Sequence, residues 1–282
     1  MIRAVRLAAY LLLPAELVLL TCLAAGVRIP TPLLLAAEAA VAAVLLAEAY
    51  VLATLFRTAR ASGLPRRAAL HDAVRQAVPA PVRGLLAHEI RALASLGLWA
   101  VRRRHGVGPG RLGFGYSRDQ NSMMLIFLFV TVLEGVALAY LIPWPALHKI
   151  MIVLHVYSVL LILGMIAAAH TRPHVIGAGE LRVRHGAAFD LRVPLRLVAR
   201  ARTENRIHDG GMVRLGEDRA DIIVAAQTNV TVELTEPVTV TKALGGTGRA
   251  SVIRLKADDA KSFVRELSIQ AQAARQESEP IA

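Results

Sequence analysis

Ionisable residues lie inside stretches of this chain that are apolar enough to cross a bilayer. Glu134 stands near the middle of the apolar run 123–142, and Glu16, Glu48 and His155 stand in three other apolar runs. A charged side chain at the centre of a bilayer is costly, so such groups usually face a protein interior that pairs them or uses them. These four residues therefore predict an intramembrane polar site.

The depth of these groups follows from the helical rise of about 1.5 Å per residue, with each run centred on the bilayer midplane. Glu16 and Glu134 fall near the midplane, and His155 falls about 5 Å toward the outside. Glu48 falls about 5 Å toward the inside, and Glu38 about 10 Å toward the outside. The five groups thus span about 15 Å of depth, which one polar site in a helix bundle can cover.

Acid–base chemistry is what such a set of groups could perform. In a low-dielectric site the pKa of a carboxylic acid rises and that of a histidine falls, which brings both toward neutrality and suits proton transfer. We predict that Glu134 and His155 transfer protons, while Glu16 and Glu48 hold the substrate or tune the first pair. The alternative is that each glutamate is protonated or hydrogen-bonded across a helix pair and only stabilises packing.

Polar residues near this set, or at its cytoplasmic edge, are candidate substrate ligands: Tyr10, Tyr157, Ser158, Arg172 and His174. Arg172 and His174 follow the last apolar run, where they attract an anion or face lipid headgroups. The predicted substrate is accordingly a small polar or anionic molecule.

A second polar cluster directly precedes the third apolar run and consists of Tyr116, Arg118, Asp119 and Asn121. Two interpretations stay open for it. The cluster lines a cytoplasmic mouth of the helix bundle, or it caps the helix, because Asp and Asn are favoured N-cap residues.

The sequence predicts no organic cofactor, and it does not favour a metal, which three of the glutamates and the histidine could bind only as an unusual ligand set. Carboxylate-bridged metal sites in four-helix bundles use Glu-x-x-His pairs on single helices, and none of the apolar runs contains such a pair. The segment GPGRLG at 108–113 matches G-x-G-x-x-G, but it follows arginines rather than a strand and is interpreted as a linker. No nucleotide, flavin or haem motif is visible elsewhere.

Composition places these residues in a membrane protein. Of the 282 residues, 55% are hydrophobic and only 19% are charged, and the mean hydropathy is +0.49. Such a chain is too apolar for an ordinary soluble domain. The apolar runs predict a membrane α-helical architecture with four transmembrane helices, as one hairpin within 1–56 and a second at 123–170.

The loop at 57–122 between the predicted hairpins carries twelve arginines, no lysine and three acidic residues. By the positive-inside rule it is cytoplasmic, which places both chain ends on the cytoplasmic side of the cell membrane. A helix at about 82–104 is expected to lie on the bilayer with its arginines at anionic headgroups, or to pack on the bundle or the C-terminal domain. Nucleic acid is not expected as a partner, because the basic residues sit where topology needs them and aromatic residues are scarce.

From residue 171 the sequence changes to short alternating or β-branched runs separated by turn residues, which is typical of strands. About seven strands and a closing helix capped by Asp258 predict a mainly-β barrel of the pleckstrin-homology (PH) type at 171–274. The tail at 275–282 is expected to be frayed.

A resemblance to known proteins rests on the segments EIRALASLGLWAVRR, FGYSRDQ, RPHVIGAGELRVRHGAAFDLRVPL, QTNVTVEL and ADDAKSFV. From about Val82 the chain resembles actinobacterial polytopic membrane proteins with a C-terminal bacterial PH-like domain. It is also similar, more weakly, to membrane-bound diazo-forming enzymes of natural-product biosynthesis. That second resemblance implies diazo formation from an amine and nitrite, a reaction whose intermediates must be kept from bulk water.

Two functions are therefore expected to compete. The first is an integral membrane enzyme that performs acid–base chemistry on a small polar substrate. The alternative is a non-catalytic scaffold or regulator whose PH-like domain binds a protein or lipid partner, since such folds host many functions. A transporter is less expected, because the spans are few and no internal repeat is evident, although an oligomer would answer the first objection.

Overall fold

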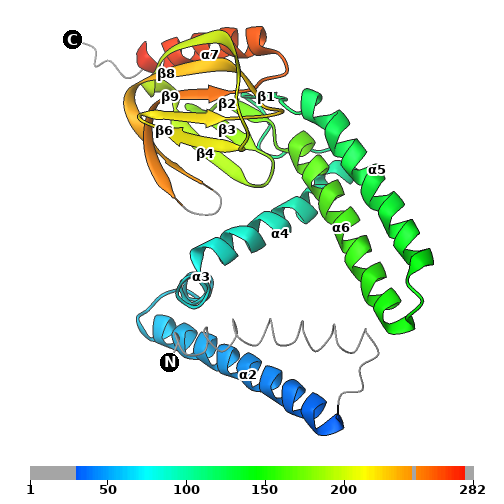
Figure 1. Ribbon diagram of the computed structural model, residues 1–282. Helices are drawn as coiled ribbons and strands as arrows, with labels where there is room; N and C mark the ends of the chain where they lie inside the picture. The colour runs from blue at the N-terminus through cyan, green and yellow to red at the C-terminus, as the bar shows by residue number, and fades with distance from the viewer. Residues whose placement is uncertain (1–29, 243–245, 277–282) are drawn as a thin grey trace. The chain divides into compact units, whose positions relative to one another are not determined.

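The computed structural model describes residues 30–242 and 246–276 (Figure 1). Tyr10, Glu16 and the first predicted transmembrane helix lie outside the described residues. The chain divides into two compact units. One holds the described residues up to 83 together with 139–151, and the other holds 84–138 and the described residues from 152 onward.

The described helices are α2 (Thr31–Ala61), α3 (Arg66–Ala77), α4 (Ala80–Ala100), α5 (Arg118–Leu141), α6 (Pro145–Thr171) and α7 (Ala260–Gln276). Three of them, α2, α5 and α6, are long and apolar enough to cross a membrane. Even the 24 residues of α5 reach about 36 Å, which exceeds the hydrocarbon thickness of about 30 Å. These helices identify a multi-pass membrane protein, and the β region and closing helix predicted to follow them are also present.

In the first unit, α3 packs against α2. Ala69 and Ala73, one turn apart on α3, are completely buried. The chain turns between the two helices at Gly63, whose φ of +87° is a conformation that favours glycine. Each helix begins beside a proline, Pro30 before α2 and Pro65 before α3, as expected for a residue with a fixed φ and no N–H.

In the second unit, small residues bring α4 and α6 into close contact. A Cβ atom added to Gly164 of α6 would lie 3.0 Å from the backbone of Ala92 on α4. Ala92 and Ala168 are completely buried and pack with Ala187 of the β region. The predicted surface helix therefore packs on a transmembrane helix, which small residues allow because they let two backbones approach.

The β region contains the strands β2 (His174–Gly177), β3 (Glu180–His185), β4 (Phe189–Pro194), β5 (Val198–Ile207), β6 (Val213–Gly216), β7 (Arg219–Ile222), β8 (Gln227–Thr241) and β9 (Thr247–Leu255). A further strand, β1 (Arg111–Phe114), comes from the loop before α5. One antiparallel sheet has the order β1-β2-β3-β4, and the other has the order β5-β8-β9-β7-β6 with β7 and β9 parallel.

The predicted closed barrel is not what forms, because the two sheets do not close. Between them the chain passes through a short 3₁₀ turn, Leu195–Leu197, directly after Pro194. Proline lacks an N–H and cannot continue a strand ladder. In the second sheet the β8–β9 register shifts between Glu233 and Val238, on either side of Pro237.

The interpretation of GPGRLG as a linker is wrong for its second half. Residues 111–114 pair with β2, with Arg111 opposite Gly177 and Phe114 opposite His174. Gly177 is required there, because its φ is +143° and an added Cβ atom would overlap the carbonyl oxygen of Gly110. The glycine-rich segment thus completes the first sheet at its edge.

Helix α7 covers the core of the β region (Figure 1). Phe263, Leu267 and Ala271 recur every four residues on one helix face and are buried among side chains of both sheets. The predicted cap needs correction. The Asp259 carboxylate accepts the N–H of Ser262 at 3.0 Å, whereas Asp258 accepts the N–H of Arg118 at 3.1 Å, at the start of α5.

Candidate functional site

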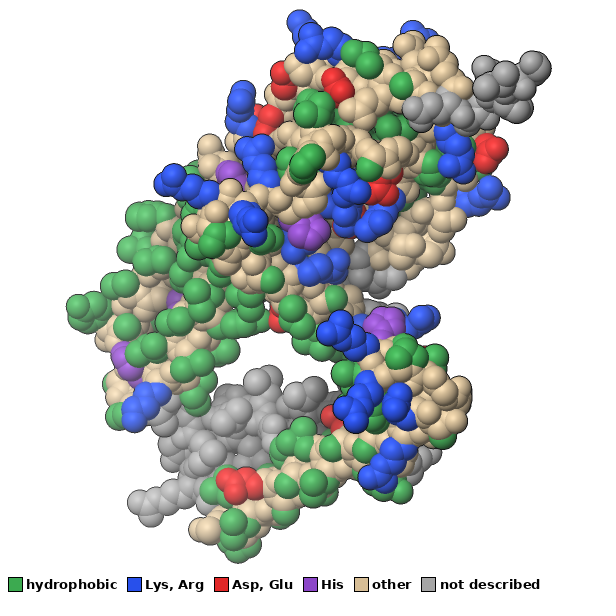
Figure 2. All heavy atoms as spheres, turned by 180° about the vertical axis from the view of Figure 1, so that it is seen from behind, with side chains coloured by type: hydrophobic (Ala, Val, Ile, Leu, Met, Phe, Trp, Pro, Cys, Tyr) green, Lys and Arg blue, Asp and Glu red, His purple; other side chains and the backbone are tan. Residues whose placement is uncertain are grey.

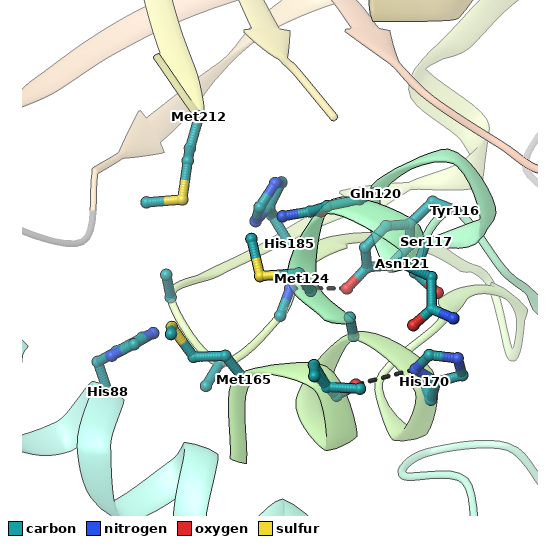
Figure 3. Close-up of a pocket in the computed structure, with 15 residues that line it drawn as sticks. His88, Tyr116, Ser117, Gln120, Asn121, Met124, Met165, His170, His185 and Met212 are labelled. Carbon is teal, nitrogen blue, oxygen red and sulfur yellow. Dashed lines mark hydrogen bonds between the residues drawn. The ribbon is translucent and has the colours of Figure 1, made fainter. Parts of the chain in front are cut away.

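A cavity of ≈ 120 Å³ lies where the membrane helices meet the β region (Figure 3). Its apolar wall consists of Met124, Met165, Ile166, Ala169, Ala187, Ala188 and Met212. Its other lining residues are His88, Tyr116, Ser117, Gln120, Asn121, His170, His185 and Gly186. These residues come from α4, the first turns of α5 with the two residues before it, the last turns of α6, the end of β3 with the turn after it, and the residue before β6, so five segments build one site.

Tyr116 fixes three of these segments to one another. Its side chain is completely buried, and its hydroxyl donates to the carbonyl of Arg172 at 3.2 Å. The same hydroxyl accepts the N–H of Gly186 at 2.6 Å, which Figure 3 marks as a dashed line. Burial raises the pKa of Tyr116 to about 12, so the phenol stays neutral and serves as a positioning group.

His174 lies directly behind Tyr116, with ring centroids 4.7 Å apart, and is completely buried. Its Nδ1 accepts the N–H of Arg184 at 3.0 Å. An amide can only donate, so the proton must be on Nε2, which donates to the carbonyl of Lys256 at 2.9 Å. Burial lowers the pKa of His174 to about 4, and both ring nitrogens of this predicted substrate ligand are used within the protein.

Histidines line the cavity from three sides. His185 is buried and His88 is half-buried, and burial is the main cause that lowers the pKa of each. Both rings are therefore neutral near pH 7. His170, at the end of α6, hydrogen-bonds through Nδ1 to the carbonyl of Ile166 at 2.9 Å (Figure 3).

An amide supplies a polar group of the cavity that has no partner. The side-chain oxygen of Gln120 is buried and, within the part of the chain that the structure describes, has no hydrogen-bond partner. A buried acceptor without a partner costs about 1–3 kcal/mol. Gln120 is therefore a cavity residue whose hydrogen-bonding capacity the described residues do not satisfy, and Ser117 and Asn121 lie beside it on the cavity wall.

The cavity wall, as the described residues form it, carries no acidic side chain. Within residues 30–242 and 246–276, no group of three or more His, Cys, Asp or Glu side chains is arranged to hold a metal ion. The titratable side chains on the cavity wall are therefore those of the three histidines, because the Tyr116 hydroxyl is already bonded to Arg172 and Gly186.

Two arginines, the half-buried Arg172 and the completely buried Arg184, connect the segments behind the cavity. Arg172 donates from Nε to the hydroxyl of Ser95 at 3.0 Å, which ties the end of α6 to α4. Arg184, which is completely buried, donates from Nη1 to the carbonyls of His105 at 2.8 Å and Pro173 at 3.3 Å. Burial lowers the pKa of Arg184 to about 10, which still leaves it charged near pH 7.

The predicted intramembrane residues are distributed over both units. Glu134 is exposed on α5, and the adjacent Gly135 packs against His155, whose Cδ2 would lie 2.5 Å from a Cβ atom added there. The Tyr157 hydroxyl donates to Glu89 of α4 at 2.8 Å, and the Ser158 hydroxyl donates to the carbonyl of Leu154.

The remaining predicted residues lie in the other unit or outside the description. Glu38 and Glu48 are exposed on α2, which belongs to the first unit. Tyr10 and Glu16 are outside the described residues. Among the described members of the predicted catalytic set, His155 therefore lies next to Gly135, the neighbour of Glu134, while Glu48 belongs to the other unit.

The polar cluster before the third apolar run divides between its two interpretations. Tyr116 and Asn121 line the cavity. Arg118 and Asp119 are exposed, and Asp119 pairs with Lys256 at 2.6 Å. The N-terminal cap comes from Asp258, which is distant in sequence.

The residues of the cavity that sequence reasoning missed include His88, Gln120, His185 and Met212. His88 is one residue among many polar ones on α4, and His185 ends a strand whose alternation gave no sign of a site. Only Gln120 carried a usable signal, because it sits inside the polar cluster that precedes α5.

Comparison with known proteins adds no assignment to this geometry. No family model matches the chain, and no curated protein or solved structure matches it either.

Proposed function

We propose that this protein is a ligand-binding regulator of the cell membrane, which binds a small molecule in the cavity between its membrane helices and its β region. The observation that carries the proposal is the buried, unpartnered oxygen of Gln120 in a cavity built by five segments. A molecule bound there contacts the ends of two transmembrane helices and a turn of the β region at once.

The cavity faces the cytoplasm in this proposal. It lies at the start of α5 and the end of α6, beside a connecting segment whose charge is strongly positive. Arginine-rich loops mark the cytoplasmic side of membrane helices. With the first transmembrane helix that the sequence predicts, both chain ends are cytoplasmic, and the β region lies on the same side.

The lining selects the class of ligand. One water needs about 10–15 Å³ of such space, so the ≈ 120 Å³ cavity holds a molecule of roughly eight non-hydrogen atoms. The Gln120 side-chain oxygen would accept a hydrogen bond from an N–H or O–H group of the ligand. The alanines and the flexible methionines would pack against an apolar part of it. With His88 and His185 neutral and no carboxylate around it, a small uncharged amide, amine or alcohol fits best.

Occupancy of the cavity would act through the contacts around Tyr116. A ligand shifts an equilibrium only by as much as it prefers one of two arrangements. Contacts to α4, α5, α6 and the β3–β4 turn exist together only when these segments are arranged around the cavity. Binding therefore stabilises that arrangement over any other. A partner of the β region that prefers this arrangement would bind more tightly when the cavity is occupied.

Filling the cavity tests the proposal. Ala169→Leu and Ala188→Leu place extra methylene groups in the ligand space, and Ala94→Leu adds the same volume at an exposed position of α4. The purified protein in lipid nanodiscs is screened by thermal denaturation against small amides, amines and alcohols. A true ligand at a hundred times its Kd stabilises the wild type and Ala94→Leu by about 2.7 kcal/mol. If no compound stabilises these two more than it stabilises the filled variants, the proposal fails.

A second candidate function is acid–base catalysis on a small substrate in the same cavity, with diazo formation as one possible reaction. The observation that favours it is that His88 and His185 are kept neutral at the cavity wall, where each can accept a proton. Catalysis predicts that His185→Gln abolishes nitrite consumption in the presence of an amine and leaves compound binding intact. A regulator predicts no nitrite consumption in the wild type, so His185→Gln would cause no loss in this assay.

A further inference from the structure

A second pocket, of ≈ 580 Å³, opens at the ends of α4 and α6. It is lined by Trp99, Ala100, Arg102, Arg103, Arg104, His170 and Thr171. Three consecutive arginines thus share one concave surface, on which no lining residue is acidic. Such a surface calls for an anion.

The backbone of the pocket holds an arginine where glycine is usual. Helix α4 ends with the N–H of Arg103 bonded to the carbonyl of Leu98 at 2.9 Å and that of Arg102 bonded to Trp99 at 3.0 Å. This is the hydrogen-bond pattern of a Schellman cap, whose key residue has a positive φ and is commonly glycine. Arg102 has a φ of 52°. An arginine at a backbone position that favours glycine is consistent with a use for its guanidinium.

These arginines also differ from those of the β region in their partners. In the β region Arg182 pairs with Asp190 at 2.5 Å, Arg219 with Asp221 at 3.3 Å, and Arg202 with Glu233. Arg102, Arg103 and Arg104 are all exposed. Across the described residues, none of the three forms an ion pair with a carboxylate. Their counter-charge has to come from outside this part of the chain.

The position of the pocket identifies the kind of anion. Thr171 is the last residue of the transmembrane helix α6, so the pocket lies at the level of the lipid headgroups. Trp99 is about half exposed (48%) at its edge, and tryptophan is enriched at this interface. Figure 2 shows how apolar the surface of the adjoining helices is, in contrast to the mixed charges of the β region.

The geometry points to a binding site for the phosphate group of an anionic phospholipid, with Arg102, Arg103 and Arg104 as its ligands and Trp99 against the glycerol and upper acyl chain. Guanidinium groups bind phosphate oxygens in paired, charge-assisted hydrogen bonds. The site is independent of the proposed ligand cavity, which has its own lining apart from His170.

Fluorescence quenching tests this site in the intact protein. The chain contains two tryptophans, so Trp144→Phe leaves Trp99 as the reporter. The protein is reconstituted in phosphatidylcholine vesicles that contain chain-brominated phosphatidylglycerol or, at the same fraction, chain-brominated phosphatidylcholine. We expect the brominated phosphatidylglycerol to quench Trp99 more strongly than the brominated phosphatidylcholine. Each arginine removed should weaken that preference roughly fivefold, as expected for one basic side chain at an anionic surface.

Two variants separate lipid recognition from folding and from net charge. Arg102→Gly relieves the backbone conformation, so it should raise the melting temperature while it weakens the lipid preference. Arg196→Gln with Arg200→Gln and Arg249→Gln removes three exposed arginines of the β region and should leave the preference unchanged. Arg102→Gly with Arg103→Gln and Arg104→Gln should abolish it.

Equal quenching by the two brominated lipids in the otherwise wild-type protein would overturn the site. An unchanged preference in the triple variant at 102–104 would do the same. Sodium phosphate provides the last arm. If it removes the preference where sodium chloride of equal ionic strength does not, the pocket binds free phosphate and the lipid assignment is overturned.

Discussion

Residue His174 shows how one buried side chain can make the stability of this protein depend on pH. Its neutral ring donates to Lys256 and accepts from Arg184, so a second proton on the ring would break the bond from Arg184. The pKa is about 4 in the folded protein and about 6.5 in an unfolded chain. Above pH 6.5 both states are neutral, and the contribution of His174 to stability is fully present.

Between pH 6.5 and 4 the unfolded chain binds a proton that the folded chain does not. The free energy of unfolding therefore decreases as the pH is lowered through this window. We expect a loss of about 3 kcal/mol across this window from His174. His88, His105 and His185, whose pKa values are also lowered, act in the same direction. The measurement is thermal denaturation from pH 7.5 to 4.5.

The variant His174→Gln should be less stable at pH 7.5 and should show a shallower fall toward pH 4.5. His71→Gln, at an exposed histidine of α3, is the matched control and should follow the wild type. A fall as steep in His174→Gln as in the wild type would show that the pH dependence arises elsewhere.

Individual site residues were predictable only where their signal was local. Tyr116 and Asn121 stood in a polar cluster next to an apolar run, and both line the cavity. Glu134 was predicted to face inward, but α5 is apolar on all sides, so its sequence does not define an inner face. In the described part of the chain Glu134 is exposed, and its orientation depends on packing that no periodicity encodes.

At the scale of elements, the contact between α4 and α6 carries a direct test. Gly164→Val would drive a branched side chain into the backbone of Ala92, since even a Cβ atom would lie 3.0 Å away. Overpacking of this kind costs about 1–3 kcal/mol. The expected result is a lower melting temperature in detergent or nanodiscs.

Gly97→Ala is the matched control on α4, because an added Cβ atom there meets nothing within 4 Å. Replacing glycine by alanine inside a helix should stabilise it by roughly 0.5–1 kcal/mol. If Gly164→Val proves as stable as the wild type, α4 does not pack on α6 in the membrane and lies free on its surface.

A helix or strand could be predicted from the sequence when the interactions that form it lie within its own segment. Hydropathy accumulates along a single segment, so α2, α5 and α6 could be located from sequence. Strand β1 has four residues, RLGF, and becomes a strand only because β2 lies beside it. The cap of α5 depends in the same way on Asp258, far along the chain, and no short-range pattern reveals such a partner.

At the scale of the whole molecule, the β region should not be stable as a separate fragment. A fragment of residues 173–282 lacks β1 and exposes the edge of β2, and it leaves His174 without its Tyr116 neighbour. Joining residues 107–117 to its N-terminus through a Gly-Ser linker should restore the edge. Circular dichroism should show a higher melting temperature for the joined fragment than for the bare one.

Leu112→Pro in the joined fragment provides the control, because proline removes an N–H from the strand that faces Ile176. This variant should melt like the bare fragment. Equal stability of the bare and joined fragments would mean that the β region folds independently of the segment before α5.

Strand β1 also has a consequence for how the protein is made. It is synthesised before α5, and its partner β2 emerges only after α6, so the first sheet cannot be completed until both helices have left the ribosome. Both strands must also reach the same side of the bilayer. Completion of the sheet therefore serves as a check on biogenesis, since a chain in which only one of the two helices had inserted would keep β1 and β2 on opposite sides.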